Sequence, residues 1–214
     1  MKLNLSVLFF FCCLISLNAN AEVRNNPIHL KNQNKELLKY QGDKHIASKN
    51  FAKKIDDSCK IAHPFGGTNE IKKCLLSKIT FGYVTTIDNM KLNEKVYLPS
   101  INGINVFLEK IKQIDTSNVS DENIVELKLF TKINDQINDS LTIYYVKNDY
   151  GAFYVESQYY YIDKYIYILK LGSDEDGSIV KFWKKYSINA NGKFKLEDSY
   201  NCHYENKLDK NICH

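Results

Sequence analysis

The sequence lacks the short motifs by which many catalytic sites are recognised. It contains no G-x-S-x-G nucleophile elbow, no H-E-x-x-H zinc pair and no glycine-rich phosphate loop. It also lacks a basic cluster, because its 29 Lys and Arg residues are mixed with 25 Asp and Glu residues along the chain. A clustered basic face is the usual footprint of nucleic-acid binding, so we expect no nucleic-acid partner. We expect no cofactor either, and the composition favours a non-enzymatic function.

Long hydrophobic runs are scarce, and the longest one lies at the start of the sequence. Lys2 precedes an apolar run from Leu5 to Leu17, and Ala19 and Ala21 follow it. The run is too short for a membrane-spanning helix, which needs roughly 18–20 residues, but it fits a signal peptide. We therefore predict a signal peptide over residues 1–21, a periplasmic or secreted protein, and no membrane span after cleavage. Cleavage would lower the formal charge from +4 to +3.

Four of the six cysteines follow the predicted signal peptide, in two pairs that are far apart in the chain. In an oxidising compartment, an even number of cysteines predicts disulfides. Three pairings are possible, and the shortest loops are closed when Cys59 joins Cys74 and Cys202 joins Cys213. We predict this pairing, in which each bridge stabilises the folded chain by on the order of 3 kcal/mol.

A metal site is the alternative use of these cysteines. Cys202-His203 and Cys213-His214 repeat a Cys-His pair, and His63 lies near the first cysteine. Neighbouring residues on a strand point to opposite faces, however, so Cys202 and His203 are poorly placed to share one ion. We therefore interpret the cysteines as structural and predict no metal site.

Acidic residues offer two further candidate sites. The run from Asp174 to Gly177 resembles part of a calcium loop, but it lacks the first ligand and the distal glutamate, so a hairpin turn accounts for it more simply. A carboxylate pair for acid–base catalysis is the second candidate, although charged residues at this density usually form a solvated face. Its possible members are Glu109, Asp115, Asp121, Glu122 and Glu126.

The spacing of apolar residues predicts an α+β fold. Residues 22–45 are polar and rich in Asn and Lys, which indicates a loosely ordered N-terminal segment. Apolar residues at helical spacing predict disulfide-linked helices over 46–82. Over 94–204 the period changes to two and turn signals recur, which predicts an antiparallel β-meander of about six strands. We thus predict a single α+β domain over residues 46–214.

Turn residues divide the second half of this meander. They predict strands near 152–161, 162–171, 179–188 and 193–203, whereas residues 104–114 fit both a helix and a strand. In the last hairpin, a three-residue loop over 190–192 brings apolar faces together, with Gly192 in the left-handed conformation. The predicted partners are Ile188 with Phe194, Tyr186 with Leu196, Phe182 with Tyr200, and Lys185 with Glu197.

Aromatic residues are concentrated in this meander. Twelve of the fifteen tyrosines lie between Tyr144 and Tyr204, and Trp183, the only tryptophan, lies between two lysines on the polar side of its strand. The indole is thus either covered by another layer or exposed to a partner. High strand propensity explains tyrosines in a sheet without any function, but Tyr and Trp also dominate interface hot spots. Our candidate partner-binding residues are Trp183, Tyr154, Tyr160, Tyr165 and Tyr167.

The sequence therefore favours a binding module of the inhibitor or immunity type, which recognises a protein partner in the cell envelope through an aromatic sheet face. A small secreted hydrolase with a carboxylate-based site is the alternative, and it predicts a concave pocket with pKa-shifted acids. An envelope chaperone that adds a client strand to its sheet is a third hypothesis, and it predicts a long unpaired edge strand.

Overall fold

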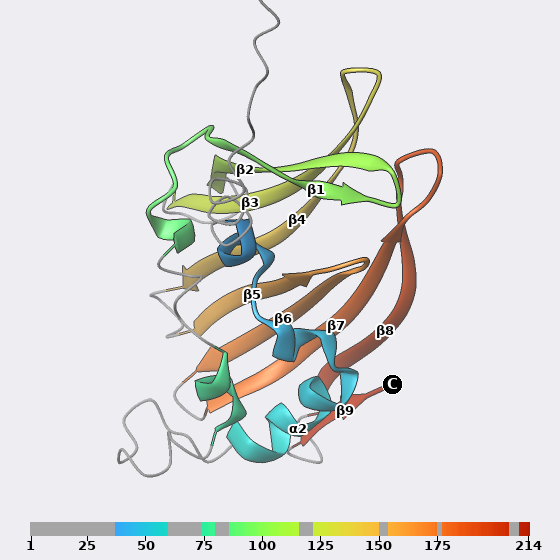
Figure 1. Ribbon diagram of the computed structural model, residues 1–214. Helices are drawn as coiled ribbons and strands as arrows, with labels where there is room; N and C mark the ends of the chain where they lie inside the picture. The colour runs from blue at the N-terminus through green and yellow to red at the C-terminus, as the bar shows by residue number, and fades with distance from the viewer. Residues whose placement is uncertain are drawn as a thin grey trace, which may run out of the picture.

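A nine-stranded antiparallel sheet dominates the computed structural model, with a few short helices on one side of it (Figure 1). The structure describes residues 37–59, 74–79, 86–115, 122–149, 154–174, 177–205 and 210–214. The predicted signal peptide over 1–21 lies outside these residues. So do 22–36 of the predicted N-terminal segment and much of the region predicted to be helical.

The strands follow one another in the sheet in chain order, so the sheet is a meander throughout. They are β1 (Lys95–Ile101), β2 (Ile104–Asp115), β3 (Glu122–Ile133), β4 (Gln136–Asp149), β5 (Tyr154–Ile162), β6 (Ile166–Asp174), β7 (Gly177–Ile188), β8 (Phe194–Glu205) and β9 (Lys210–Cys213). The predicted meander is confirmed, with more strands than expected. The ambiguous residues 104–114 form β2, and Asp174 pairs with Gly177 at the predicted hairpin turn.

Among the described residues, helical structure is short. The named elements are the 3-10 turns η1 (Lys39–Gln41), η2 (Lys44–Ala47) and η3 (Leu75–Lys78) and the helix α2 (Lys49–Cys59). In the second half of the region predicted to be helical (46–82), residues 74–79 are described, and they form the short turn η3. The antiparallel sheet of the α+β prediction is therefore confirmed, and the helices of the described residues are few.

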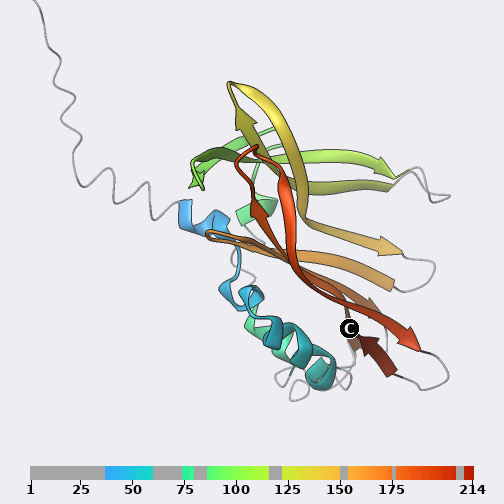
Figure 2. The ribbon, with the colours of Figure 1, turned by 90° about the vertical axis from the view of Figure 1, so that its right-hand side faces the viewer.

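Helix α2 packs one apolar side against the sheet. Ser48 accepts a hydrogen bond from the backbone N–H of Phe51 (3.2 Å), which satisfies a donor at the start of the helix. Ile55 and Cys59 are buried on the side that faces β7, whereas Lys53 is exposed. Figure 2 shows the helices gathered on one side of β5–β7.

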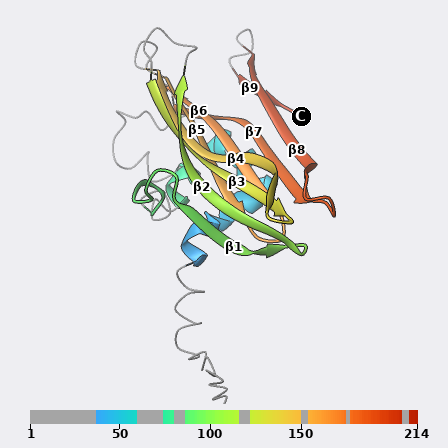
Figure 3. The same cartoon turned by 90° about the horizontal axis from the view of Figure 1, so that it is seen from above.

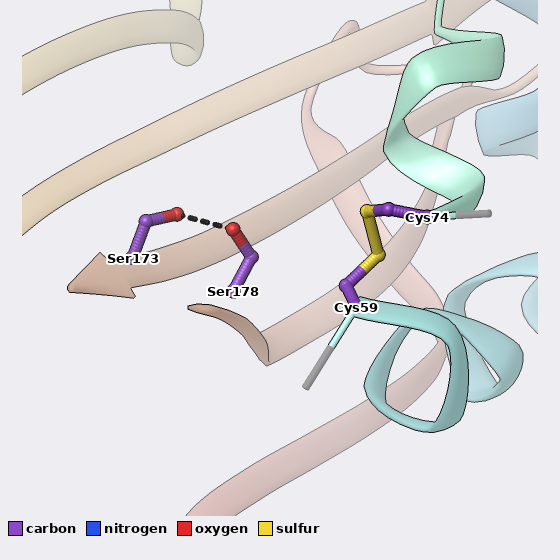
Figure 4. The surroundings of a disulfide bond; sticks show 4 residues. All are labelled: Cys59, Cys74, Ser173 and Ser178. Carbon is purple, nitrogen blue, oxygen red and sulfur yellow. Dashed lines mark hydrogen bonds between the residues drawn. A yellow bond between two sulfur atoms is a disulfide. The ribbon is translucent and has the colours of Figure 1, made fainter. Parts of the chain in front are cut away.

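Both predicted disulfides are present. Cys59 at the end of α2 joins Cys74 beside η3, and Cys202 on β8 joins Cys213 on β9. The first bridge lies near the β6–β7 turn, where Ser173 and Ser178 are hydrogen-bonded (Figure 4). The second bridge joins directly opposed residues of β8 and β9, the last two strands of the sheet (Figure 3).

The predicted register of the β7–β8 hairpin is right near its loop and wrong beyond it. Ile188 pairs with Phe194 and Tyr186 with Leu196, and Gly192 has a φ of 68°, as expected. A β-bulge then inserts Glu197, so that the next pairs are shifted by one residue. Lys185 therefore faces Asp198, Trp183 faces Tyr200, and Phe182 faces Asn201.

The bulge allows β8 to contact helix α2. It moves Asp198 and Tyr200 onto the face that carries Trp183, under α2. There Lys49 of α2 donates a hydrogen bond to Asp198 (2.7 Å), and the Lys53 amino group lies 5.5 Å from the centre of the Tyr200 ring. Both contacts tie the helix to β8.

The sheet forks between β4 and β5. Their pairing ends at Tyr145 and Gln158, and the free edge of β5 beyond that point is met by the N-terminal segment. Gly42 forms an antiparallel bridge with Tyr161, and the N–H of Asp43 donates to the Tyr160 carbonyl (3.0 Å). The Tyr160 hydroxyl in turn donates to the carbonyl of Tyr40 (2.8 Å).

Gly42 is the position at which this contact tolerates no side chain. Its φ of 83° and ψ of −159° are accessible essentially to glycine alone, and an added Cβ would collide with the backbone carbonyl of Tyr160. Gly103 also has a positive φ (78°), but an added Cβ would meet no atom within 4 Å there.

We predict that Gly42→Ala destabilises the protein by about 2 kcal/mol or more beyond the effect of Gly103→Ala, because only Gly42 combines backbone strain with a backbone collision. Urea unfolding of both variants and the parent measures the difference. Equal losses of stability in the two variants would show that the Gly42 contact does not anchor the N-terminal segment.

Candidate functional site

The aromatic residues nominated from the sequence lie mostly inside the molecule. Tyr160 is fully buried, Trp183 is 2% exposed and Tyr167 is 8% exposed, whereas Tyr154 and Tyr165 are partly exposed. The structure thus places three of the five side chains in the core, where they do not present a surface to a partner. The predicted recognition face does not form as a single exposed patch of these residues.

Trp183 is buried because the helical layer covers it. Its indole Nε1 donates a hydrogen bond to the backbone carbonyl of Ile46 (2.7 Å), which follows the usual pattern for a buried tryptophan. The lysines beside it misled the expectation of a polar face. Lys185 extends along the aromatic surface instead, with its amino group 3.8 Å from the centre of the Tyr165 ring.

The opposite face of the sheet carries a row of polar and aromatic side chains. Because directly opposed residues of neighbouring strands share a face, the register places one residue from each of five strands in a line. This polar row consists of Glu126, Tyr145, Gln158, Lys170 and Phe182, from β3 to β7.

Glu156 on β5 connects two members of the polar row, Tyr145 and Lys170. Its Oε1 accepts hydrogen bonds from the hydroxyl of Tyr145 (2.5 Å) and from Nζ of Lys170 (2.8 Å). The Lys170 amino group also lies 5.7 Å from the ring centres of Tyr145 and Phe182. Only about a quarter of the Glu156 side chain is exposed (26%), so solvent screens this pair only in part.

The electrostatics of this cluster oppose proton transfer near neutral pH. Burial by itself would raise the pKa of Glu156, but the hydrogen bonds from Lys170 and Tyr145 and the charges of Lys170 and Lys147 outweigh it and lower the pKa of this carboxyl. Burial and the bond to Glu156 raise the pKa of Tyr145 far above its ordinary value. Both pKa values are shifted away from neutral pH, whereas an acid–base catalyst needs a pKa near the pH at which it works.

A second row on the same face of β3 is purely aromatic. Tyr97 on β1 is paired with Phe107 on β2, which is paired with Phe130 on β3. The ring centres of Tyr97 and Phe107 are 5.5 Å apart, and those of Phe107 and Phe130 are 5.1 Å apart and stacked. Tyr97 is 57% exposed, so this aromatic row ends at the surface.

Charged and apolar side chains flank the aromatic row. Lys95 forms an ion pair with Glu109 (3.8 Å), and its amino group lies 5.4 Å from the Phe107 ring centre. Beyond Phe130 on the same side of β3, Lys132 is paired in register with the exposed Ile137. The arrangement is an apolar centre with a charged margin, as in many protein interfaces.

The aromatic row was not predicted from the sequence. Phe107 lies in the stretch that was ambiguous between helix and strand, so its face was undefined. Phe130 alternates out of phase with the buried Leu127 and Leu129, and this parity was the available signal.

A small pocket lies between β1, the β5–β6 turn and η1. Its volume is about 290 Å³, near the lower end of the range for small-molecule sites. Two of its polar side chains are engaged within the protein: Asn102 donates to the Ile188 carbonyl (3.1 Å), and Asp163 accepts from the Tyr165 N–H (2.7 Å). The lining residues are Gln41, Leu98–Asn102 and Ile162–Lys164.

The described residues contain no group of three or more His, Cys, Asp or Glu side chains that could hold a metal ion. Within the same ranges, no helix has both the length and the apolar character needed to cross a membrane. No protein-family model matches this chain, and no match was found among curated proteins or solved structures. The class that the structure defines is thus a disulfide-linked antiparallel β-meander protein.

We predict that Glu156→Gln lowers the free energy of unfolding by about 1–2 kcal/mol at pH 7, because it removes the charge that accepts both hydrogen bonds. The pKa of Glu156 in the folded state lies below its unfolded value of about 4.3, so its contribution is present above that pH and is lost as the pH falls through the folded pKa. The difference in the free energy of unfolding between parent and variant should therefore become smaller toward pH 3.

Denaturant unfolding at both pH values measures this effect, with Glu197→Gln as the control. Glu197 also pairs with a lysine and has a lowered pKa, but it is solvent-exposed, so its replacement should change stability much less. If the stability difference between the parent and Glu156→Gln does not depend on pH, the pKa of Glu156 is not lowered by its partners.

Proposed function

We propose that this chain is an exported, non-enzymatic binding module of the inhibitor or immunity type, and that a protein partner docks on the aromatic row. The observation that carries the proposal is the registered line Tyr97, Phe107 and Phe130, in which the buried Phe107 lies between a partly buried ring and the mostly exposed ring of Tyr97. An anchored, rigid aromatic side chain offers large contact area at a low entropic cost on binding.

The electrostatics support binding rather than hydrolysis. Three described carboxyl groups have a resolved pKa shift, and the pKa is lowered in each case. Hydrogen bonds are the main lowering cause: from Lys170 and Tyr145 to Glu156, from Ser187 and Lys195 to Glu197, and from Lys49 to Asp198. A carboxylate-based hydrolase needs one acid whose pKa is raised toward neutrality. The described part of the chain offers paired, ionised carboxylates instead, which are suited to fixing the sheet surface.

The sheet edges argue against a chaperone that adds a client strand. β1 contains Pro99 and an irregular register between Leu98 and Ile101, and β9 spans only residues 210–213 and is tied down by a disulfide. Proline, bulges and short edge strands are the features by which proteins prevent pairing at an edge. Docking on a face is therefore the better supported mode.

Export is supported by the cysteines. Two disulfides persist in oxidising compartments such as the periplasm and are rare in the cytosol. The apolar run over 5–17 supplies the matching targeting signal.

We predict that the protein recovered from cells begins at Glu22 and carries both bridges. Intact-mass measurement before and after reduction should show the loss of residues 1–21 and the gain of four hydrogens. Recovery of a full-length chain with reduced thiols would contradict export, while leaving the docking face to be judged separately.

We predict that Tyr97→Ala weakens binding of the envelope partner roughly tenfold or more, because it removes the exposed end of the aromatic row. Tyr204→Ala is the matched control, since Tyr204 is also an exposed strand tyrosine (42%) but lies on β8. Affinity capture identifies the partner, and titration of the purified pair with each variant measures the dissociation constant. Unchanged binding by Tyr97→Ala, or equal loss in Tyr204→Ala, would place the interface elsewhere.

A further inference from the structure

The last two strands bring together two histidines that are eleven residues apart in the sequence. Cys202 and Cys213 are directly opposed on β8 and β9, so the residue that follows each of them points to the other face of this ribbon. His203 and His214 are therefore diagonal neighbours on one face. Both are exposed, and their ring centres are 6.2 Å apart.

The backbone around both histidines is fixed. The disulfide locks the register of the ribbon, and Asn201 and His214 exchange two backbone hydrogen bonds (2.9 and 3.0 Å) that extend the pairing beyond β9. The separation of the two backbone positions is thus set by the fold. A fixed pair of ligands loses less conformational entropy on binding an ion than two independent side chains.

The ring separation is compatible with one bridging ion. A metal–nitrogen bond of about 2.0–2.1 Å puts each imidazole centre roughly 3 Å from the ion, so two ligating rings are separated by at most about 6 Å. A small rotation of either exposed side chain brings both rings within this limit. Imidazole nitrogens suit copper, nickel and zinc, and copper binds such ligands most tightly among the divalent first-row ions.

We propose that His203 and His214 form a two-histidine site for a divalent transition-metal ion, with Cu²⁺ the preferred occupant and water in its remaining coordination positions. The repeated Cys-His pair in the sequence is then explained without a metal-bound cysteine. The cysteines hold the two strands together from one face, and the histidines bind the ion from the other. The site is independent of the proposed docking face.

The experiment titrates Cu²⁺ into the oxidised mature protein by calorimetry and compares four chains. We expect one equivalent of Cu²⁺ to bind the parent. His203→Ala and His214→Ala should each lower the affinity for Cu²⁺ at least about tenfold, because the loss of even an outer-shell partner of a metal commonly has an effect of this size. His45→Gln is the control, because His45 is partly exposed but bonded to Asp43 (2.8 Å) and far along the chain. It should bind like the parent.

Electron paramagnetic resonance of the one-equivalent complex gives a second readout. Coupling to two imidazole nitrogens is expected in the parent, and coupling to one in either alanine variant. The proposal is overturned if either alanine variant keeps the parental affinity, if the spectra of parent and variants coincide, or if His45→Gln weakens binding equally. Circular dichroism verifies that each variant keeps the sheet.

Discussion

The fold depends on how the free edge of β5 is satisfied after β4 leaves it. Backbone N–H and C=O groups in a sheet interior need partners, and beyond Gln158 the neighbouring strand no longer supplies them. The N-terminal segment does so through Gly42 and Asp43, and this contact fixes where η2 and α2 begin. The helical layer can then cover Trp183, whose indole is bonded to the Ile46 carbonyl. One short stretch of chain thus joins the fork in the sheet to the core beneath α2.

The two faces of the sheet consequently differ in character. The face with Trp183 is closed by helices and supplies much of the buried core. On the other side of β3, the polar row and the aromatic row alternate charged pairs with rings, and Lys170 serves both as an ion-pair partner of Glu156 and as a cation beside two aromatic rings. The contacts within this surface order its side chains, which would lower the entropic cost of the docking that we propose.

Local patterns predicted the parts of this structure that local physics determines. Alternation and turn residues located β5 to β8, and loop length selected the pairing of Cys59 with Cys74 and of Cys202 with Cys213. Contacts between distant segments were not predictable in this way. The bulge at Glu197 and the burial of Trp183 both follow from the docking of α2, and no pattern within β7 or β8 encodes that event.

The connectivity of the disulfides has a consequence for biogenesis. Among the four cysteines that follow the predicted signal peptide, each is bonded to its neighbour in chain order, so a chain that entered an oxidising space N-terminus first would meet the correct sulfur before a later competitor. On the proposed export route, vectorial oxidation alone would produce the native bridges without a shuffling step. The protein should therefore mature normally in cells that have a disulfide-introducing oxidase but lack the isomerase that corrects mispaired thiols.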